Sequence, residues 1–129
     1  MKKIPVLVLL LFYTSAVYAQ SAFELVKKDV DIGKNFLNEG KPKEAQKMFD
    51  WAIRRSKTKK YREGHPDTFI LIGDAYLTCN SPNPDKAFLI YYAACGIDKK
   101  YCNKTEDPIF DAVKKEDLLK QGFIFSTKN

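Results

Sequence analysis

The residues of this chain best suited to chemistry are three cysteines and one histidine. Cys79, Cys95 and Cys102 lie in the second half of the sequence, and His65 is the only histidine. Zinc sites usually contain ligand pairs roughly two to four residues apart, a spacing that these cysteines lack. A nucleophilic cysteine would need an activating base, and only His65 could serve. We therefore expect one structural disulfide, one buried thiol, and neither a metal site nor a cofactor.

The second chemical feature is a cluster of positive charge. Six basic residues occur among the nine positions 54–62: Arg54, Arg55, Lys57, Lys59, Lys60 and Arg62. Arg54 and Arg55 fit the end of a helix, where the helix dipole favours cations. The other four fit either a solvated loop or a contact for an acidic protein or anionic lipid.

The N-terminus has the pattern of a secretory signal peptide. Lys2 and Lys3 precede an apolar stretch that begins at Ile4, and small residues lead to Ala19. The apolar stretch is shorter than the roughly 20 residues of a transmembrane helix, so we expect residues 1–19 to be cleaved rather than to span a membrane. An uncleaved N-terminal anchor is the alternative. Cleavage between Ala19 and Gln20 leaves residues 20–129, in which 20 basic residues face 16 acidic ones. A net charge of +4 does not indicate a nucleic-acid partner.

Apolar spacing predicts an all-α domain made of two similar helix pairs. Ile32-Gly33, Phe36, Ala45, Phe49 and Ala52 match Ile72-Gly73, Tyr76, Ala87, Tyr91 and Ala94. The spacing differs only between the glycine and the first alanine, where the second copy has two more residues. We expect a first helix over 23–38, followed by a second helix after Pro42. The first helix would have Leu25, Ile32 and Phe36 on one side and Val26, Val30 and Leu37 on an adjoining one. His65 and Asn83, each before a proline, are candidate helix caps.

Gly33 and Gly73 are expected where two helices cross closely. Glycine weakens a helix by roughly 1 kcal/mol relative to alanine, and a close crossing would offset that cost. Ala45 and Ala87 would be the small partners at these crossings, with the aromatic residues filling the space beside them. The alternative is an unrelated four- or five-helix bundle with accidental periodicity.

This pattern resembles the tetratricopeptide repeat, a helix-turn-helix unit of about 34 residues. The similar regions are residues 26–59 and 66–101, and Gly73-Asp74-Ala75-Tyr76 is especially close to the pattern. The usual tryptophan and closing proline are absent from both copies. The copies are offset by 40 residues, which places a longer connection at 57–65. The resemblance implies antiparallel helix pairs stacked as a right-handed, solenoid-like array.

The resemblance also implies a protein-binding groove formed mainly by the first helix of each pair. Its expected lining is Lys27, Lys34, Leu37 and Asn38 from the first pair, and Ile70, Asp74, Leu77 and Thr78 from the second. The family's clamp for a C-terminal carboxylate is not expected, because Asp74 would repel such a group. A groove that mixes Lys34 with Asp74 favours a protein surface of mixed charge.

A C-terminal segment, residues 105–121, is expected to cap the second pair as a helix that begins at Asp107-Pro108. Ile109, Phe110, Val113 and Leu118 would form its apolar stripe. The apolar residues 123–125 would fold back on the bundle or dock into another chain. Cys79 and Cys95 are expected at opposite ends of the fourth helix, beyond disulfide reach, so Cys95 and Cys102 are the expected pair.

No phosphate-binding loop, dinucleotide fingerprint or nucleophile elbow occurs in the sequence, so we do not expect an enzyme. The expected function is that of an exported adaptor or assembly factor, acting in a bacterial periplasm or after secretion. Its partner would be another protein, such as a component of an envelope complex. The alternative is a periplasmic immunity protein, or another inhibitor, that blocks a toxin or an enzyme. The sequence leaves the oligomeric state open.

Overall fold

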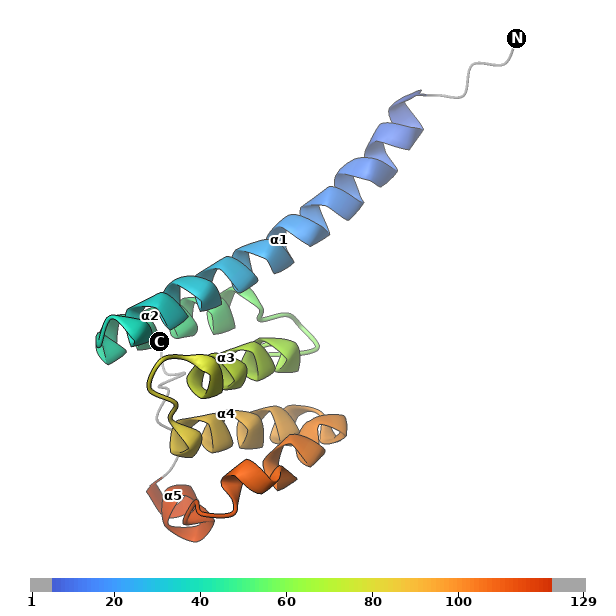
Figure 1. Ribbon diagram of the computed structural model, residues 1–129. Coiled ribbons are helices and arrows are strands. Elements are labelled where there is room, and N and C mark those ends of the chain that lie inside the picture. Colours follow the sequence, from blue (N-terminus) through green and yellow to red (C-terminus); the bar gives the residue numbers. More distant parts are fainter. Residues whose placement is uncertain (1–5, 122–129) are drawn as a thin grey trace.

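A computed structural model describes the backbone of residues 6–121 and the side chains of residues 22–121. This part of the chain forms five α-helices and two short 3-10 helices, and it contains no strand (Figure 1). The expected all-α class is therefore confirmed. The elements are α1 (Val6–Asn38), α2 (Pro42–Arg55), α3 (Pro66–Thr78), α4 (Pro84–Ile97), η1 (Lys99–Glu106), η2 (Pro108–Phe110) and α5 (Lys115–Gln121).

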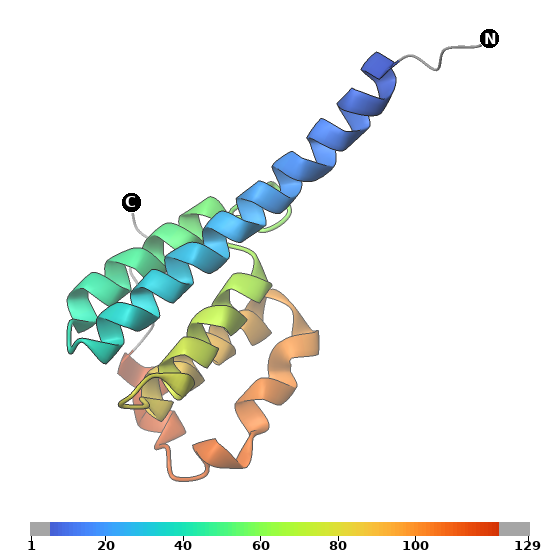
Figure 2. The same cartoon turned by 45° about the horizontal axis from the view of Figure 1, so that its top comes forward.

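The helices pack in adjacent pairs, α1 with α2 and α3 with α4. The two pairs meet mainly through α1 and α3, which run in the same direction (Figures 1 and 2). At one end, the backbone N–H of Asn80 donates a 2.7 Å hydrogen bond to Oδ1 of Asn38. At the other end, Val26 and Thr68 line the same hollow. The first helices of the two pairs are thus neighbours along their length.

Local sequence signals account for where the helices begin. Pro42, Pro66 and Pro84 each occupy the first turn of a helix, where a missing N–H removes no intrahelical bond. Before α3, Nδ1 of His65 accepts a hydrogen bond from the N–H of Asp67 at 3.1 Å. Before α4, Oδ1 of Asn83 accepts one from the N–H of Lys86 at 3.1 Å. The expected capping by His65 and Asn83 is therefore confirmed.

The core repeats the same contact in both helix pairs. A methyl group added at Gly33 would lie within 3.0 Å of three ring atoms of Phe49, and one added at Gly73 within 2.9 Å of three ring atoms of Tyr91. Ala45 and Ala87 are fully buried beside these rings. The two glycines therefore let an aromatic ring of the following helix lie directly on the helix backbone. This contact is the close crossing that the sequence predicted.

The first helix is longer than expected. It begins at Val6 rather than at residue 23, and residues 6–21 extend beyond the packed helices (Figures 1 and 2). Leu25, expected on the buried side, is 44 % exposed, while Val26 and Val30 are buried. The inner face is therefore centred on the Val26–Val30 row. In the part of the chain that the structure describes, no helix is both long and apolar enough to cross a membrane.

The C-terminal cap is not the single helix expected over 105–121. It consists of η2 and the end of η1, followed by a turn and the short helix α5. Phe110 is fully buried, with its ring centroid 5.7 Å from that of Phe88 and 5.8 Å from that of Tyr91. Ile109, by contrast, is 48 % exposed. A 3-10 helix repeats every three residues, so it does not maintain the wide apolar stripe of an α-helix. Residues 123–125 lie outside the described part.

Candidate functional site

The apolar members of the predicted groove lie partly within the core. Leu37, Ile70 and Leu77 are half-buried and pack against the main apolar cluster. Leu37 comes from α1, and Ile70 and Leu77 come from the neighbouring helix α3. These three side chains therefore contribute to the packing of the two pairs, with only part of their surface available to a partner.

The polar members of this groove mostly make contacts within the chain. Oδ1 of Asn38 accepts from the N–H of Asn80, and the hydroxyl of Thr78 donates to the carbonyl of Asp74 at 2.8 Å. Asp74 also accepts a hydrogen bond from the Tyr91 hydroxyl on α4. Burial and this hydrogen bond raise the pKa of Tyr91 well above the usual tyrosine value, so the hydroxyl remains a donor.

The two predicted groove lysines differ in their surroundings. Lys27 is exposed, pairs with Glu24 at 3.6 Å, and lies 5.6 Å from the ring centroid of Phe23. Lys34 is half-buried on α1. The Asp74 carboxylate accepts a hydrogen bond from Tyr91, and Lys27 pairs with Glu24. Lys34 is therefore the lysine of the predicted groove that has no ion pair among the described residues.

A hollow of about 290 Å³ lies where the packed part of α1 meets the end of α2 and the start of α3. Its walls are Ala22, Phe23, Val26, Arg55, Ser56, Thr58, His65, Asp67 and Thr68. Next to it, Nε of Arg55 donates a 2.7 Å hydrogen bond to Asp29, whose carboxylate is almost wholly buried. The apolar residues come from α1, and the polar ones come from the end of α2, the connection over 56–65 and the start of α3. This arrangement suits an apolar side chain that enters past charged groups.

The six residues of the basic cluster are all exposed at the end of α2 and in the connection over 56–65. Arg54 and Arg55 occupy the last turn of α2, as expected. Arg55 pairs with Asp29, whereas the other five have no carboxylate within ion-pair distance among the described residues. This part of the surface therefore carries a local excess of positive charge.

The connection is held in one conformation by its own hydrogen bonds. The N–H of Thr58 donates to the carbonyl of Tyr61 at 3.1 Å, and the N–H of His65 donates to the hydroxyl of Ser56 at 3.0 Å. The rings of Tyr61 and His65 meet edge to face, 4.6 Å apart. Gly64, at φ +125°, is buried against Ile53 and Phe69. The cations are thus presented by an ordered segment that is anchored in the core.

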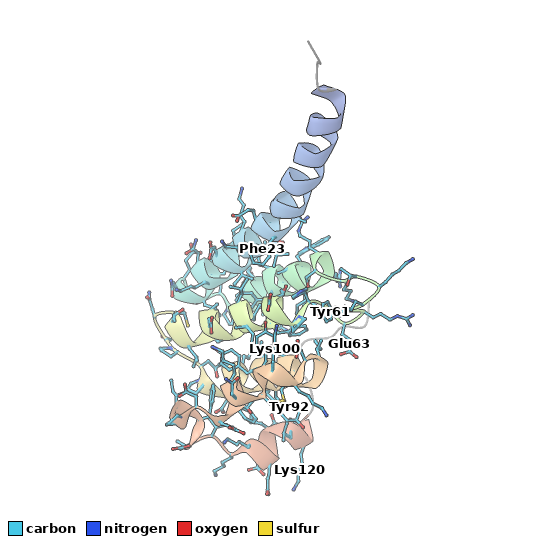
Figure 3. The ribbon with its side chains drawn as sticks, turned by 90° about the vertical axis from the view of Figure 1, so that its right-hand side faces the viewer. Phe23, Tyr61, Glu63, Tyr92, Lys100 and Lys120 are labelled. Atoms are coloured by element: carbon cyan, nitrogen blue, oxygen red, sulfur yellow. A yellow bond between two sulfur atoms is a disulfide. The ribbon has the colours of Figure 1, made fainter. Side chains whose placement is uncertain are left out.

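The same connection lies against the end of α4. A hollow of about 330 Å³ is lined by Lys59, Lys60, Tyr61, Arg62 and Glu63 from the connection and by Gly96 and Ile97 from α4. Lys99 and Lys100 follow directly in sequence, and Lys100 pairs with Asp98 at 3.8 Å. Figure 3 looks onto this end of the molecule, with Tyr61, Glu63 and Lys100 labelled. Tertiary packing therefore adds residues 96–100 to the basic cluster.

Sequence reasoning missed two features of this end. Trp51, the only tryptophan in the chain, is 52 % exposed on α2. Arg54 and Arg55 lie 5.7 and 5.9 Å from its ring. Its position is out of phase with the apolar stripe of Ala45, Phe49 and Ala52, and that phase could have identified it. The hydrogen bond from the Tyr101 hydroxyl to Asp67 joins residues far apart in sequence and had no local signal.

The three cysteines are arranged as expected. Cys95 and Cys102 form a disulfide, with their Cα atoms 4.4 Å apart, and this bond ties η1 to the end of α4. Cys79 is a buried free thiol at the end of α3 that donates weakly to the carbonyl of Ser81 at 3.3 Å. Among the described residues, no group of three or more histidine, cysteine, aspartate or glutamate side chains could hold a metal ion.

Comparison with protein-family models, with curated proteins and with solved structures finds no match to this chain.

Proposed function

We propose that this protein is a non-catalytic protein-binding module built from two degenerate tetratricopeptide repeats. The observation that carries the proposal is the repeated contact of Gly33 with Phe49 and of Gly73 with Tyr91. Equivalent residues meet in the same way in both pairs, and the first helices of the pairs run side by side. Proteins built in this way offer a continuous face for another protein. The functional step rests on an analogy of fold.

Export to the periplasm or to the outside of the cell belongs to the same proposal. Residues 6–21 extend away from the packed helices, so removal of residues 1–19 would leave the two helix pairs and their cap intact. The Cys95–Cys102 disulfide is suited to an oxidising compartment, where such bonds persist. Cleavage between Ala19 and Gln20 would release the domain from the exporting membrane.

Two kinds of partner are compatible with a protein-binding module. An adaptor or assembly factor would hold envelope components with modest affinity along the face of α1 and α3. An inhibitor, such as an immunity protein, would hold one folded toxin or enzyme tightly across a broad surface. The observation that favours the second candidate is the ordered end of the molecule around Trp51, because tryptophan and arginine are enriched among residues that dominate binding energy.

The test is affinity capture of the exported protein from its own cell envelope, followed by mass spectrometry and titration of the captured partner. One enzyme or toxin bound at nanomolar strength or tighter would identify an inhibitor. Several envelope components bound more weakly would identify an adaptor. If the wild-type protein captures no specific partner, the proposal is wrong.

The groove can be tested in the same experiment with a matched pair of variants. Lys34→Glu places a negative charge on the face of α1, and Lys43→Glu makes the same change on the exposed start of α2. Loss of capture with Lys34→Glu but not with Lys43→Glu would assign the contact to the groove. Equal capture by both variants would move the contact elsewhere on the surface.

A further inference from the structure

We propose that the end of the molecule around the 56–65 connection is a docking surface for an acidic segment of a protein partner. We call this surface the basic end and define it by Arg54, Lys57, Lys59, Lys60, Arg62 and Lys99, with Trp51 at its edge. The inference rests on the proposed protein-binding function and adds the chemistry of the partner and the place where it binds.

The basic end carries more positive charge than its neighbouring carboxylates balance. The carboxylates packed at this end already have partners: Asp29 binds Arg55, Asp98 pairs with Lys100, and Asp67 accepts from the Tyr101 hydroxyl. Glu63 is the remaining acidic group in the connection, and it stands beside Arg62. The six cations of the basic end have no ion pair within 4.0 Å in the described part of the chain, and Asp50, beside Trp51 on α2, is the carboxylate that interacts electrostatically with Arg54. The repulsion between these like charges destabilises the folded state, and a complementary negative surface would relieve this repulsion.

The segment that carries most of these cations has a fixed conformation. A solvated loop needs no fixed shape, yet the N–H of Thr58 donates to the carbonyl of Tyr61, the N–H of Tyr61 donates to the Thr58 hydroxyl, and Gly64 is buried against Ile53. An ordered surface loses little conformational entropy when a partner binds, so its charges contribute more of their interaction energy to affinity. The basic end is therefore organised for binding before a partner arrives.

The lining of the neighbouring hollow favours a protein partner over other polyanions. The hollow of about 330 Å³ between the connection and α4 contains Tyr61, Ile97 and Glu63 beside the cations. An apolar side chain flanked by carboxylates fits the apolar part of this lining, Tyr61 and Ile97, whereas the phosphates of a lipid headgroup layer or of a nucleic-acid backbone bring no apolar side chain to fill it. Trp51, stacked near Arg54, adds an aromatic surface of the kind that anchors protein interfaces.

Trp51 makes the proposal directly measurable. As the only tryptophan, it reports binding at this end through its fluorescence. The probe is a short synthetic peptide of glutamate and aspartate residues around a central leucine, titrated into the purified protein at low and at physiological salt. The same peptide with glutamine and asparagine in place of the acids is the neutral control. We expect the acidic peptide to shift the Trp51 emission, with an affinity that falls as salt increases.

Two triple variants distinguish an effect of this surface on peptide binding from an effect of the protein's net charge. Lys59→Glu/Lys60→Glu/Arg62→Glu reverses the basic end, and Lys43→Glu/Lys114→Glu/Lys120→Glu makes the same change of net charge at exposed positions elsewhere. We expect the first to weaken peptide binding by at least about tenfold and the second to change it less than about twofold. Both variants must still unfold cooperatively on heating, and Lys59→Gln/Lys60→Gln/Arg62→Gln is the milder substitute if the first does not fold.

The outcomes distinguish the two proposals. Equal weakening by both triple variants, or no shift of Trp51 emission, would overturn the docking surface. Tighter binding to phosphatidylglycerol vesicles or to a DNA duplex than to the peptide would overturn it as well. A partner captured equally by the wild type and by the basic-end variant would overturn the docking surface while the proposed protein-binding function stands. Absence of any captured partner would count against the proposed function, whereas the peptide titration is independent of that capture.

Discussion

At the scale of single residues, Gly33 and Gly73 determine how closely the helices of each pair approach. Neither glycine adopts a positive φ, so the requirement is space for the ring of Phe49 or Tyr91 rather than backbone freedom. The penalty of glycine in a helix is offset by the contact between the ring and the exposed backbone. The same solution in both pairs indicates that the spacing between glycine and aromatic residue is a structural requirement of this fold.

Substitution of these glycines should destabilise the protein. Gly33→Ala and Gly73→Ala would each push a buried ring out of place and lower the free energy of unfolding by about 1–3 kcal/mol. Gly96→Ala is the control, because no atom lies within 4 Å of the added methyl group; it should raise stability by up to about 1 kcal/mol. Thermal and urea unfolding measure all three. A rise in stability for Gly33→Ala would contradict the close contact.

A second prediction at this scale concerns Tyr91 and pH. Burial and the hydrogen bond to Asp74 raise the pKa of its hydroxyl above the ordinary 10.0. The folded state therefore holds this proton more tightly than the unfolded chain does. The free energy of unfolding should have its full value below about pH 10 and should fall as the pH rises further. Tyr91→Phe should cost about 1 kcal/mol at neutral pH and make the alkaline fall shallower. An unchanged slope in urea titrations would contradict this assignment.

At the scale of elements, the short 3-10 helix η1 depends on two long-range ties. The Cys95–Cys102 disulfide joins it to the end of α4, and the Tyr101 hydroxyl binds Asp67 at the start of α3. A 3-10 helix has weaker hydrogen-bond geometry than an α-helix and needs such support. These ties also fix Lys99 and Lys100 against the end of α4. The element is therefore a brace for the basic end as well as part of the cap.

Removal of the disulfide should loosen this element first. Cys95→Ala/Cys102→Ala frees a loop whose ends are 7 residues apart and should lower stability by about 2 kcal/mol. Hydrogen exchange should rise over residues 99–106 more than in α1 and α2. The wild type should respond to a reductant in the same way, and the double variant should not respond at all. In the unreduced, denatured wild type, titration should find one thiol, that of Cys79. Three thiols would contradict the bridge.

At the scale of the whole molecule, the packed part of the structure begins at about the point where the expected signal peptide ends. Residues 6–21 of α1 project beyond the two helix pairs, whereas Val26 and Val30 belong to the core. The α1 backbone continues through Ala19 and Gln20, although only its second half packs on other helices. The packed helices are therefore contained in the part that would remain after the proposed cleavage.

This division predicts how the exported protein behaves. Mass spectrometry of the protein recovered after export should find Gln20 as its first residue. Its unfolding midpoint should equal that of the full chain purified from the cytosol under matched redox conditions, because the backbone of residues 6–21 extends away from the two helix pairs in Figures 1 and 2. A first residue at Met1 would refute cleavage. A lower midpoint for the shorter form would show that the projecting part stabilises the fold.

The sequence by itself determined the four helices of the two pairs and their pairing, but not the start of α1 or the three short elements of the cap. Proline with a capping residue starts α3 and α4, and the glycine-to-aromatic spacing places Phe49 and Tyr91 on their partner helices. These features depend on residues that are close in the sequence, so a periodic pattern of residue types reveals them. For the same reason, the nearby cysteines Cys95 and Cys102 could be paired from their spacing.

Only the tertiary structure decided how the surface is assembled. The Arg55–Asp29 pair spans 26 residues and the Tyr101–Asp67 bond spans 34, and no local pattern predicts either. The basic cluster over 54–62 is visible in the sequence as a run of cations. The fixed conformation of the 56–65 connection, and its position beside α4, depend on Gly64 packing against Ile53. The hydrogen bond that occupies Asp74 likewise comes from another helix. Contacts between distant segments are set by packing of the whole fold, so a single sequence does not reveal them.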